Sequence, residues 1–138
     1  MKNETQIDGI IVAGQPTDEE LAGLAERGIR TLINVRPADE LDEPEAPKVP
    51  SGIAYSEVPF TGLTLRAEHV RRIREALDAG DGPAVIHCAA GTRAAVVAAI
   101  VASERAGEDA RGALERLAKA GFDPDGSPYR GFIERYFF

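Results

Sequence analysis

The sequence predicts an α/β domain in three layers, with a central, mainly parallel sheet of four or five strands flanked by helices. Short apolar runs recur along the chain, and most are followed by a segment whose apolar residues have helical spacing. Strands that alternate with helices are typical of a parallel sheet, because each parallel connection must cross back along the sheet. A chain of 138 residues can bury one core, so we expect a single domain over residues 1–138.

The first half of the chain contains three strand candidates, at residues 10–13, 31–35 and 53–58. Between the first two, Thr17 has capping-box spacing to a glutamate three residues later, which predicts a helix that ends near Gly28. After the second candidate, residues 37–50 contain four prolines and five acidic residues. That composition is typical of a long surface loop.

The second half of the chain continues the alternation. An amphipathic helix is expected over residues 67–77, and residues 84–86 predict a buried strand. Residues 93–105 are apolar on nearly every face, as in a helix enclosed by the core. Further helices are expected over residues 110–118 and after Ser127, whose hydroxyl and following proline suit a helix start.

The composition excludes several classes of function. The formal net charge of −7 argues against a nucleic-acid or anionic membrane partner, because such binding requires clustered Lys and Arg. A small anion can still bind, since the local field inside a cleft outweighs the net charge. The single cysteine cannot form an internal disulfide, and no Cys/His cluster has the spacing of a metal site. We therefore expect no metal and no cofactor.

The sequence also bears on localisation. The N-terminal residues lack the apolar stretch of a signal peptide, and the longest apolar run, residues 94–102, is too short to span a bilayer. A reactive cysteine suits a reducing compartment. We expect a cytoplasmic protein.

Residues 87–93, His-Cys-Ala-Ala-Gly-Thr-Arg, are the most informative segment. The strand before them and the helix after them place Cys88 at the carboxyl end of a strand and beside a helix N-terminus. A helix N-terminus favours anions and the thiolate form of a cysteine. Arg93 adds a planar fork that can hold two oxygens. The segment therefore predicts a nucleophile inside an anion-binding loop, with the loop formed by Ala89, Ala90, Gly91 and Thr92.

Two more polar residues, Gln15 and Arg36, follow strand candidates in the same way. Active sites of parallel sheets lie at the carboxyl ends of the strands. The three positions therefore point to one edge of the sheet.

An ordered set of short strings extends over residues 8–125. The set contains Gly14-Gln15-Pro16, the run from Gly28 to Pro37, Val58-Pro59-Phe60, the cysteine loop, and Ala120-Gly121-Phe122-Asp123. In this order the strings resemble the bacterial beta-lactamase hydrolase-like phosphatase family (DUF442), a relative of dual-specificity and protein tyrosine phosphatases.

The resemblance implies a cysteine-phosphatase fold and hydrolysis of phosphate monoesters of a small molecule or a protein, including phosphotyrosine. It implies that Cys88 attacks phosphorus to form a phosphocysteine, while Arg93 and the loop amides hold the phosphoryl oxygens. It further implies a hydroxyl donated by Thr92 to the thiolate, and supporting roles for His87, Gln15 and Arg36. His87 fits equally well as a buried strand histidine that bonds to the backbone.

The chain departs from the tyrosine phosphatase pattern at three points. Four residues separate Cys88 from Arg93, where those enzymes have five, and Ala94 follows where they usually have Ser or Thr. Residues 58–62 contain no acid where those enzymes carry a catalytic aspartate. The general acid is therefore unassigned, with three candidates: Asp39, Glu40 and Glu57.

Two alternatives use the same loop. Rhodanese-type sulfurtransferases also place a cysteine in an anion loop between strand and helix, where it carries a persulfide and needs no general acid. In the other alternative the loop binds phosphate without turnover. The oligomeric state is left open.

Overall fold

A five-stranded sheet forms the centre of the protein, and the computed structural model describes all of residues 1–138. Its spatial order is β1-β2-β5-β3-β4. The strands are β1 (Thr5–Ile7), β2 (Ile10–Ala13), β3 (Thr31–Asn34), β4 (Ala54–Glu57) and β5 (Ala84–His87). Strands β2, β5, β3 and β4 pair in parallel, and only β1 is antiparallel, against β2. The predicted mainly parallel sheet is confirmed.

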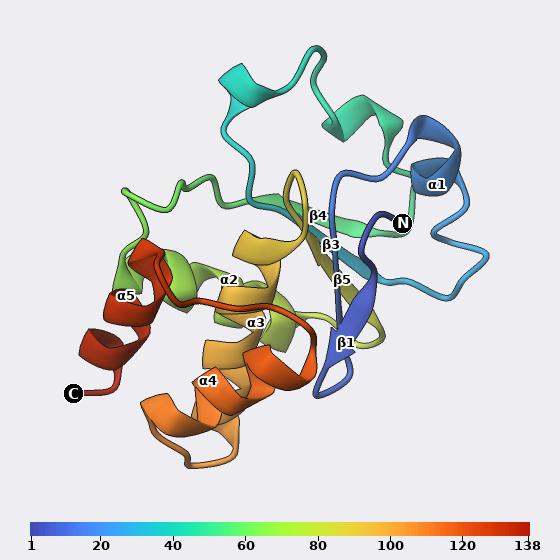
Figure 1. Ribbon diagram of the computed structural model, residues 1–138. Coiled ribbons are helices and arrows are strands. Elements are labelled where there is room, and N and C mark those ends of the chain that lie inside the picture. Colours follow the sequence, from blue (N-terminus) through green and yellow to red (C-terminus); the bar gives the residue numbers. More distant parts are fainter.

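Helices cover both faces of the sheet, as Figure 1 shows. Four of them lie on one face: α2 (Ala67–Ala79), α3 (Thr92–Arg105), α4 (Ala110–Lys119) and α5 (Pro128–Tyr136). The short α1 (Asp18–Ala22) packs on the opposite face. The predicted three-layer arrangement is therefore correct.

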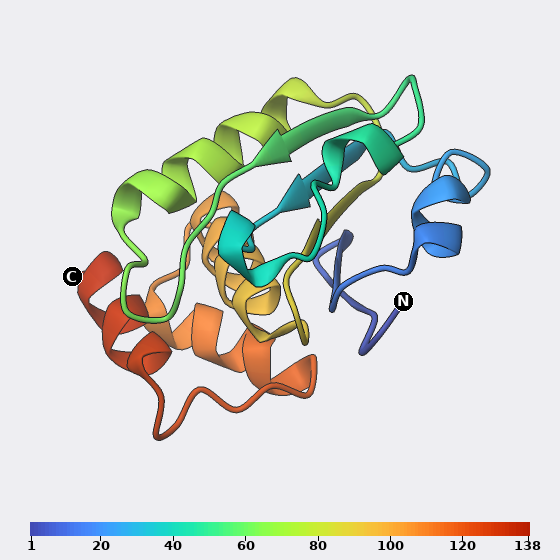
Figure 2. The ribbon, with the colours of Figure 1, turned by 90° about the horizontal axis from the view of Figure 1, so that it is seen from above.

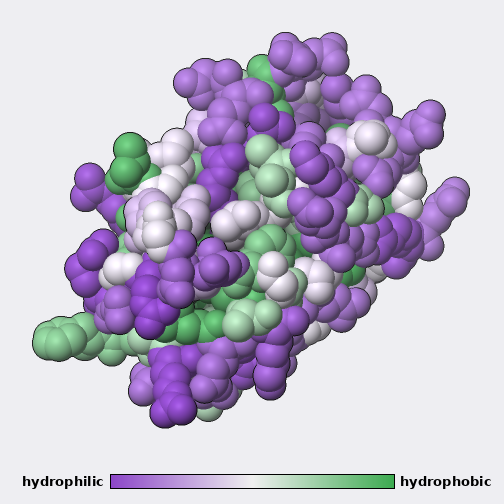
Figure 3. Space-filling view, in the orientation of Figure 1, coloured by the Kyte–Doolittle hydropathy of each residue, from purple (hydrophilic) through white to green (hydrophobic).

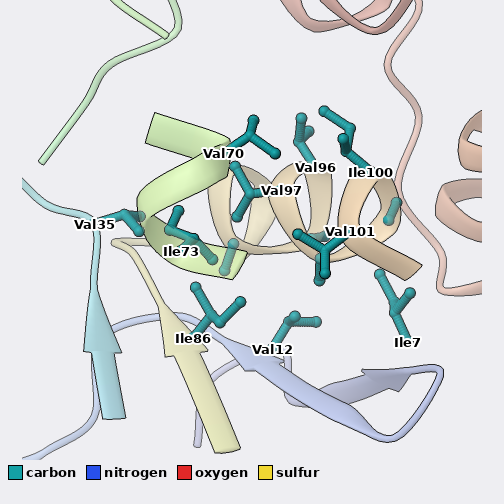
Figure 4. Close-up of a cluster of buried hydrophobic side chains, with 14 of the residues drawn as sticks. Ile7, Val12, Val35, Val70, Ile73, Ile86, Val96, Val97, Ile100 and Val101 are labelled. Carbon is teal, nitrogen blue, oxygen red and sulfur yellow. The ribbon is translucent and has the colours of Figure 1, made fainter. Parts of the chain in front are cut away.

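The strand register explains why the sheet has two apolar faces. Val12 and Ile33 pair with Ile86, and all three belong to the large cluster. Figure 4 shows Val12 and Ile86 pointing toward α2 and α3. The neighbouring positions of the same strands belong to the smaller cluster under α1, namely Ile11, Leu32 and Val85. Successive strand residues point to opposite faces, so a sheet buried on both sides has to be apolar at every position.

Helix α3 is the central helix of the large cluster. Its ten residues from Ala94 to Ser103 are all buried, in contact with β2, β5, α2 and α4. Many of these residues are alanines, whose small side chains let the neighbouring elements approach closely. The enclosure fixes the axis of α3, and with it the position of the cysteine loop at its N-terminus.

Two local features differ from the prediction. The structure has a strand, β1, that was not predicted from the sequence. Asp8 and Gly9, with φ angles of 51° and 83°, form the Asp-Gly turn typical of a two-residue hairpin and connect β1 to β2. The first helix has the predicted capping box at Thr17, but it ends at Ala22, with Gly23 as its C-cap. Residues 24–28 continue as hydrogen-bonded turns, so Gly28, at φ 80°, closes a turn rather than the helix.

The long acidic segment, residues 37–50, runs without strand pairing above the carboxyl end of the sheet (Figure 1). It contains two short 3-10 turns, η1 (Ala38–Glu40) and η2 (Ala46–Lys48). Figure 3 shows that this face of the molecule is mostly hydrophilic, the part over the segment included. None of the helices combines the length and apolar character needed to cross a membrane.

The enclosure of α3 gives a first test. Replacing the fully buried Ile100 by alanine removes methyl groups from the large cluster and leaves a cavity. We expect the free energy of unfolding to fall by about 2–5 kcal/mol. Leu63, which is 92% exposed, is the matched control, and Leu63→Ala should change the free energy by less than about 0.5 kcal/mol in the same urea titration.

Candidate active site

The loop between β5 and α3 is fixed to the end of β2. The backbone N–H of Cys88 donates to the carbonyl of Ala13 at 3.1 Å, and that of Gln15 donates to the carbonyl of Ala89 at 3.1 Å. A side chain at Gly14 would meet the Ala89 oxygen at 2.7 Å, so glycine permits this close approach. The N-terminal turn adds a third contact, from the side-chain amide of Asn3 to the carbonyl of Ala90 at 2.8 Å.

Cys88 lies at the bottom of this loop and is 1% exposed. Its Sγ accepts a hydrogen bond from the backbone N–H of Gly91 at 3.1 Å. Gly91 has a φ of 104°, a left-handed conformation that glycine adopts without strain, and it is the N-cap of α3. The thiol therefore faces a backbone donor. The hydroxyl of Thr92, for which the resemblance implied this role, makes no hydrogen bond to it.

Several backbone N–H groups of the loop have no acceptor within the protein. They belong to Ala89, Ala90, Thr92 and Arg93. Two of the four open helix α3, where backbone donors and the helix dipole together favour an anion. The arrangement is suited to a tetrahedral oxyanion above the thiol.

Arg93 sits in the first turn of α3, with a side chain that is 14% exposed. One terminal nitrogen donates to the carbonyl of Phe60 at 3.1 Å. The guanidinium also forms a two-point contact with the carboxylate of Glu40, at 3.0 Å and 2.8 Å. The hydrogen bond from Arg93 holds the pKa of Glu40 below its usual value despite partial burial.

Arg36 lies beside this pair. Its Nε approaches the carboxylate of Glu40 at 3.3 Å, and one terminal nitrogen donates to the Glu40 carbonyl at 2.9 Å. Its other terminal nitrogen donates to the side-chain oxygen of Gln15 at 3.0 Å. Gln15 and Arg36, which were both predicted to follow strands at this edge of the sheet, are therefore in direct contact, across the intervening strand β5.

Glu45 connects this group to the nucleophile strand. It is 2% exposed, and its two oxygens accept hydrogen bonds from Gln15 at 2.7 Å and from the Tyr55 hydroxyl at 3.1 Å. One oxygen also lies 2.7 Å from Nε2 of His87, which is fully buried. Burial opposes the charge of Glu45, but the hydrogen bond and charge of His87 outweigh it and lower the pKa of the carboxyl.

Two aromatic hydroxyls border these groups. Burial raises the pKa of Tyr55, and the nearby Glu45 raises it further. Burial also raises the pKa of Tyr129, whose hydroxyl lies over Gly62 near the thiol. Both phenols are therefore neutral around pH 7.

The structure brings together most of the residues that the sequence singled out. Cys88, Arg93, Gln15, Arg36 and His87 form one connected group at the carboxyl edge of the sheet. Of the three acid candidates, only Glu40 contacts the group. Asp39 is exposed and makes no side-chain hydrogen bond or ion pair, and a carboxylate oxygen of Glu57 lies 2.9 Å from the Tyr55 hydroxyl, whose single proton it shares with Glu45.

Sequence reasoning missed Glu45 and Tyr55 as members of the site. Glu45 is one of five acids in a segment that looks uniformly solvated, and its partner His87 is 42 residues away. No local pattern marks such a contact. The structure contains no group of three or more His, Cys, Asp or Glu side chains arranged to hold a metal ion.

A thiol within an amide loop at the carboxyl end of a parallel sheet, followed by an arginine on the next helix, defines a cysteine-phosphatase-like α/β domain. The model of one family, the phosphatase-like domain of beta-lactamase hydrolase-like proteins, matches residues 4–106. The chain belongs to this family, as its resemblance predicted.

Curated relatives agree with this assignment. A beta-lactamase hydrolase-like protein from Xylella fastidiosa is 31% identical over 97 residues, which cover 66% of this chain and 22% of the relative. One from Agrobacterium fabrum is 32% identical over 93 residues, covering 62% and 21%. The chain therefore matches only about a fifth of the length of these relatives.

Solved structures share the fold. A protein from Shewanella putrefaciens assigned as a DUF442 phosphatase has a TM-score of 0.81 at 18% identity, covering 99% of this chain and 89% of the other. TpbA from P. aeruginosa in complex with pTyr has a TM-score of 0.74 at 19% identity, covering 96% and 83%. At these identities the likeness establishes the fold of tyrosine-phosphatase-like proteins.

The buried contact of Glu45 predicts a large effect on stability. In Glu45→Ala, the fully buried His87 and the half-buried Gln15 and Tyr55 lose their shared partner. We expect the free energy of unfolding at pH 7 to fall by about 3–5 kcal/mol, measured by urea titration. Asp39→Asn, at a solvated acid without a partner in the same segment, should change it by less than about 0.5 kcal/mol.

The same contact predicts a pH dependence. The pKa of Glu45 in the folded protein is below the ordinary value of 4.5, so the unfolded chain binds more protons just below that pH. The contribution of Glu45 to stability is therefore complete above about pH 4.5 and is lost as the pH falls through the folded-state pKa. Acidification should destabilise the wild type more than Glu45→Ala. Equal slopes in the two proteins would contradict this.

Proposed function

We propose that the protein is a cysteine-dependent phosphatase that hydrolyses phosphate monoesters through a phosphocysteine on Cys88. The observation that supports this most directly is the geometry above the thiol. The loop that holds the thiol has four N–H groups without a protein acceptor, two of them at the N-terminus of α3, and Arg93 in the first turn of that helix is close enough to Cys88 for an electrostatic interaction. Membership in a phosphatase-like family supports the same reaction.

The Glu40 carboxylate shows what the Arg93 fork can hold. A carboxylate presents two oxygens to a guanidinium in the same way as a phosphoryl group does, and Glu40 accepts from both terminal nitrogens. A phosphoryl group has further oxygens for which the loop amides without a protein acceptor are available donors. Donors fixed before the reaction stabilise the charge that spreads over the three equatorial oxygens in the transition state.

The proposed reaction has two steps. The Cys88 thiolate attacks phosphorus, a sulfur–phosphorus bond forms, and the bond to the leaving oxygen breaks with its electron pair on that oxygen. Water then attacks the phosphocysteine, which releases phosphate and restores the thiolate. Throughout, the hydrogen bond from Gly91 holds the sulfur in place, and the buried position of Cys88 limits access to groups that can enter the loop.

The proposed substrate is a phosphorylated small molecule or protein side chain. The pTyr complex of the structurally similar TpbA supports a phosphate ester as the ligand class. Beside the site the phenol of Tyr129 lies against Gly62. Tyr129 interacts electrostatically with both Cys88 and Arg93, so an aromatic ring is available beside the site and aryl phosphates are the first substrates to test.

The nucleophile is tested by release of p-nitrophenol from p-nitrophenyl phosphate. We expect turnover in the wild type and none above background in Cys88→Ser, with vanadate as an inhibitor of the wild-type reaction. Thiocyanate formation from thiosulfate and cyanide, in a folded protein without ester hydrolysis, would instead indicate sulfur transfer. Tight phosphate binding with neither activity would indicate a binding module.

The arginine is tested by a change that keeps its charge. In Arg93→Lys a single ammonium replaces the planar fork, so one of the two oxygen contacts is lost. We expect kcat/KM for p-nitrophenyl phosphate to fall by about 10²–10³-fold. Arg71→Lys is the matched control. Arg71 lies on the exposed face of α2 and pairs only with Glu75, so this change should leave kcat/KM unchanged.

A further inference from the structure

The carboxylate of Glu40 lies on the same guanidinium that the proposed phosphatase needs for its substrate. Its two oxygens take both terminal nitrogens of Arg93, and Arg36 approaches the same carboxylate at 3.3 Å. A phosphoryl group cannot make the two-point contact with Arg93 while Glu40 holds it. Binding of substrate therefore requires Glu40 to move away from Arg93 and leaves a carboxyl group beside the phosphoryl oxygens.

The segment that carries Glu40 is anchored on both sides of it. Before it, Arg36 is tied to Gln15, and after it Glu45 is buried against His87. Figure 2, which looks onto the carboxyl end of the sheet, shows the turn η1 (Ala38–Glu40) over the region between β3 and the start of α3. The Glu40 side chain itself is 30% exposed. A rotation of this side chain can release Arg93 without displacing the anchors.

We propose that Glu40 is the acid–base residue of the reaction: it moves away from Arg93 when the phosphoryl group binds there, takes up a proton from solvent water, and donates that proton to the leaving oxygen. This proposal rests on the phosphatase function proposed above. It supplies the acid that residues 58–62 lack. Glu40 fills this role from the segment after β3, whereas the resemblance implied an acid in the loop after β4.

The proton balance follows in both steps. In the first, the electron pair of the broken phosphorus–oxygen bond takes the proton of the Glu40 carboxyl, which becomes a carboxylate. In the second, this carboxylate accepts a proton from the attacking water as the sulfur–phosphorus bond breaks. The second step restores the protonated carboxyl with which the first step began, so a single group serves as acid and then as base. When phosphate leaves, Glu40 releases its proton to solvent and pairs with Arg93 again as a carboxylate.

The electrostatics of the site favour this change of protonation. In the free protein Arg93 keeps Glu40 ionised, because the hydrogen bond lowers its pKa. A bound dianion removes this partner and places negative charge next to the carboxyl, and both changes raise its pKa. The other charged or titratable groups near Glu40 are Arg36, Cys88 and Tyr129, and those that line the adjoining cavity of about 300 Å³, namely Asp18, Asp42, Glu43, Glu45 and Lys48.

The other two candidates lack this placement. Asp39 is exposed and contacts none of the site residues. Glu57 is at the end of β4, the strand at the sheet edge, and is bonded to Tyr55 rather than to Arg93 or Arg36.

The first experiment compares leaving groups. Glu40→Gln cannot donate a proton, so we expect kcat/KM for phenyl phosphate to fall by about 10²–10⁴-fold. The loss should be much smaller for p-nitrophenyl phosphate, whose leaving group departs without a proton. Asp39→Asn is the matched control and should retain both rates. A Glu40→Gln protein that keeps the wild-type kcat/KM on phenyl phosphate as well as on p-nitrophenyl phosphate would overturn the proposal.

The second experiment needs no turnover. Tungstate, a dianion near neutral pH, is titrated by calorimetry into Cys88→Ser in buffers of different ionisation enthalpy, which reports the protons taken up on binding. The Cys88→Ser background removes the thiol as a proton source. We expect uptake that depends on Glu40, and an affinity that weakens by up to about tenfold per pH unit as the pH rises. The double variant with Glu40→Gln should show neither effect.

The two experiments separate the two proposals. Turnover that requires Cys88, together with tungstate binding whose proton uptake is the same with and without Glu40, would overturn the role of Glu40 and leave the phosphatase proposal standing. Proton uptake that requires Glu40, in a wild-type protein that hydrolyses no aryl phosphate, would overturn the phosphatase proposal instead.

Discussion

The buried hydrogen bond between Glu45 and His87 is the interaction on which the site depends most. Residues 37–50 have no strand partner, and nothing in their composition gives them one conformation. Glu45 reaches from the middle of this segment to the strand that precedes the nucleophile, and it is 2% exposed there. A buried carboxylate is stable only where donors surround it, so its three partners restrict where the segment can lie. The position of Glu40 over Arg93 follows from that restriction.

The charges of the site are balanced locally, in a protein of net charge −7. Arg93 and Arg36 face the carboxylate of Glu40, and the acidic segment lies above a loop built to attract anions. This arrangement keeps the two arginines paired in a partly buried place, where an unpaired charge is costly. It also means that any anion entering the loop competes with a residue of the protein itself, so entry of the anion and movement of the acidic side chain are coupled.

The rigidity of α3 serves this chemistry. The helix is buried along ten residues, and both the arginine and two of the four amides without an acceptor belong to its first turn. Donors on a rigid element keep their positions whether or not a ligand is bound. Such fixed donors stabilise the charge of a transition state without a cost of reorganisation. The short spacing of four residues between Cys88 and Arg93 is accommodated by Gly91, whose left-handed conformation turns the chain directly into the helix.

The sequence by itself determined the elements and the centre of the site. Apolar periodicity, the Thr17 capping box and the strand–cysteine–helix pattern are local, so the sheet, α3 and the cysteine loop were predictable from them. The Asp8-Gly9 turn of the β1–β2 hairpin is equally local, since this residue pair is typical of a two-residue hairpin. Only the tertiary structure decided which of the acidic residues of the segment 37–50 enter the site. Glu40, Glu45 and Asp39 lie in the same acidic, proline-rich segment, and nothing in the local sequence distinguishes them. Glu40 contacts Arg93 and Glu45 contacts His87, and these partners are far away along the chain and become neighbours only after folding.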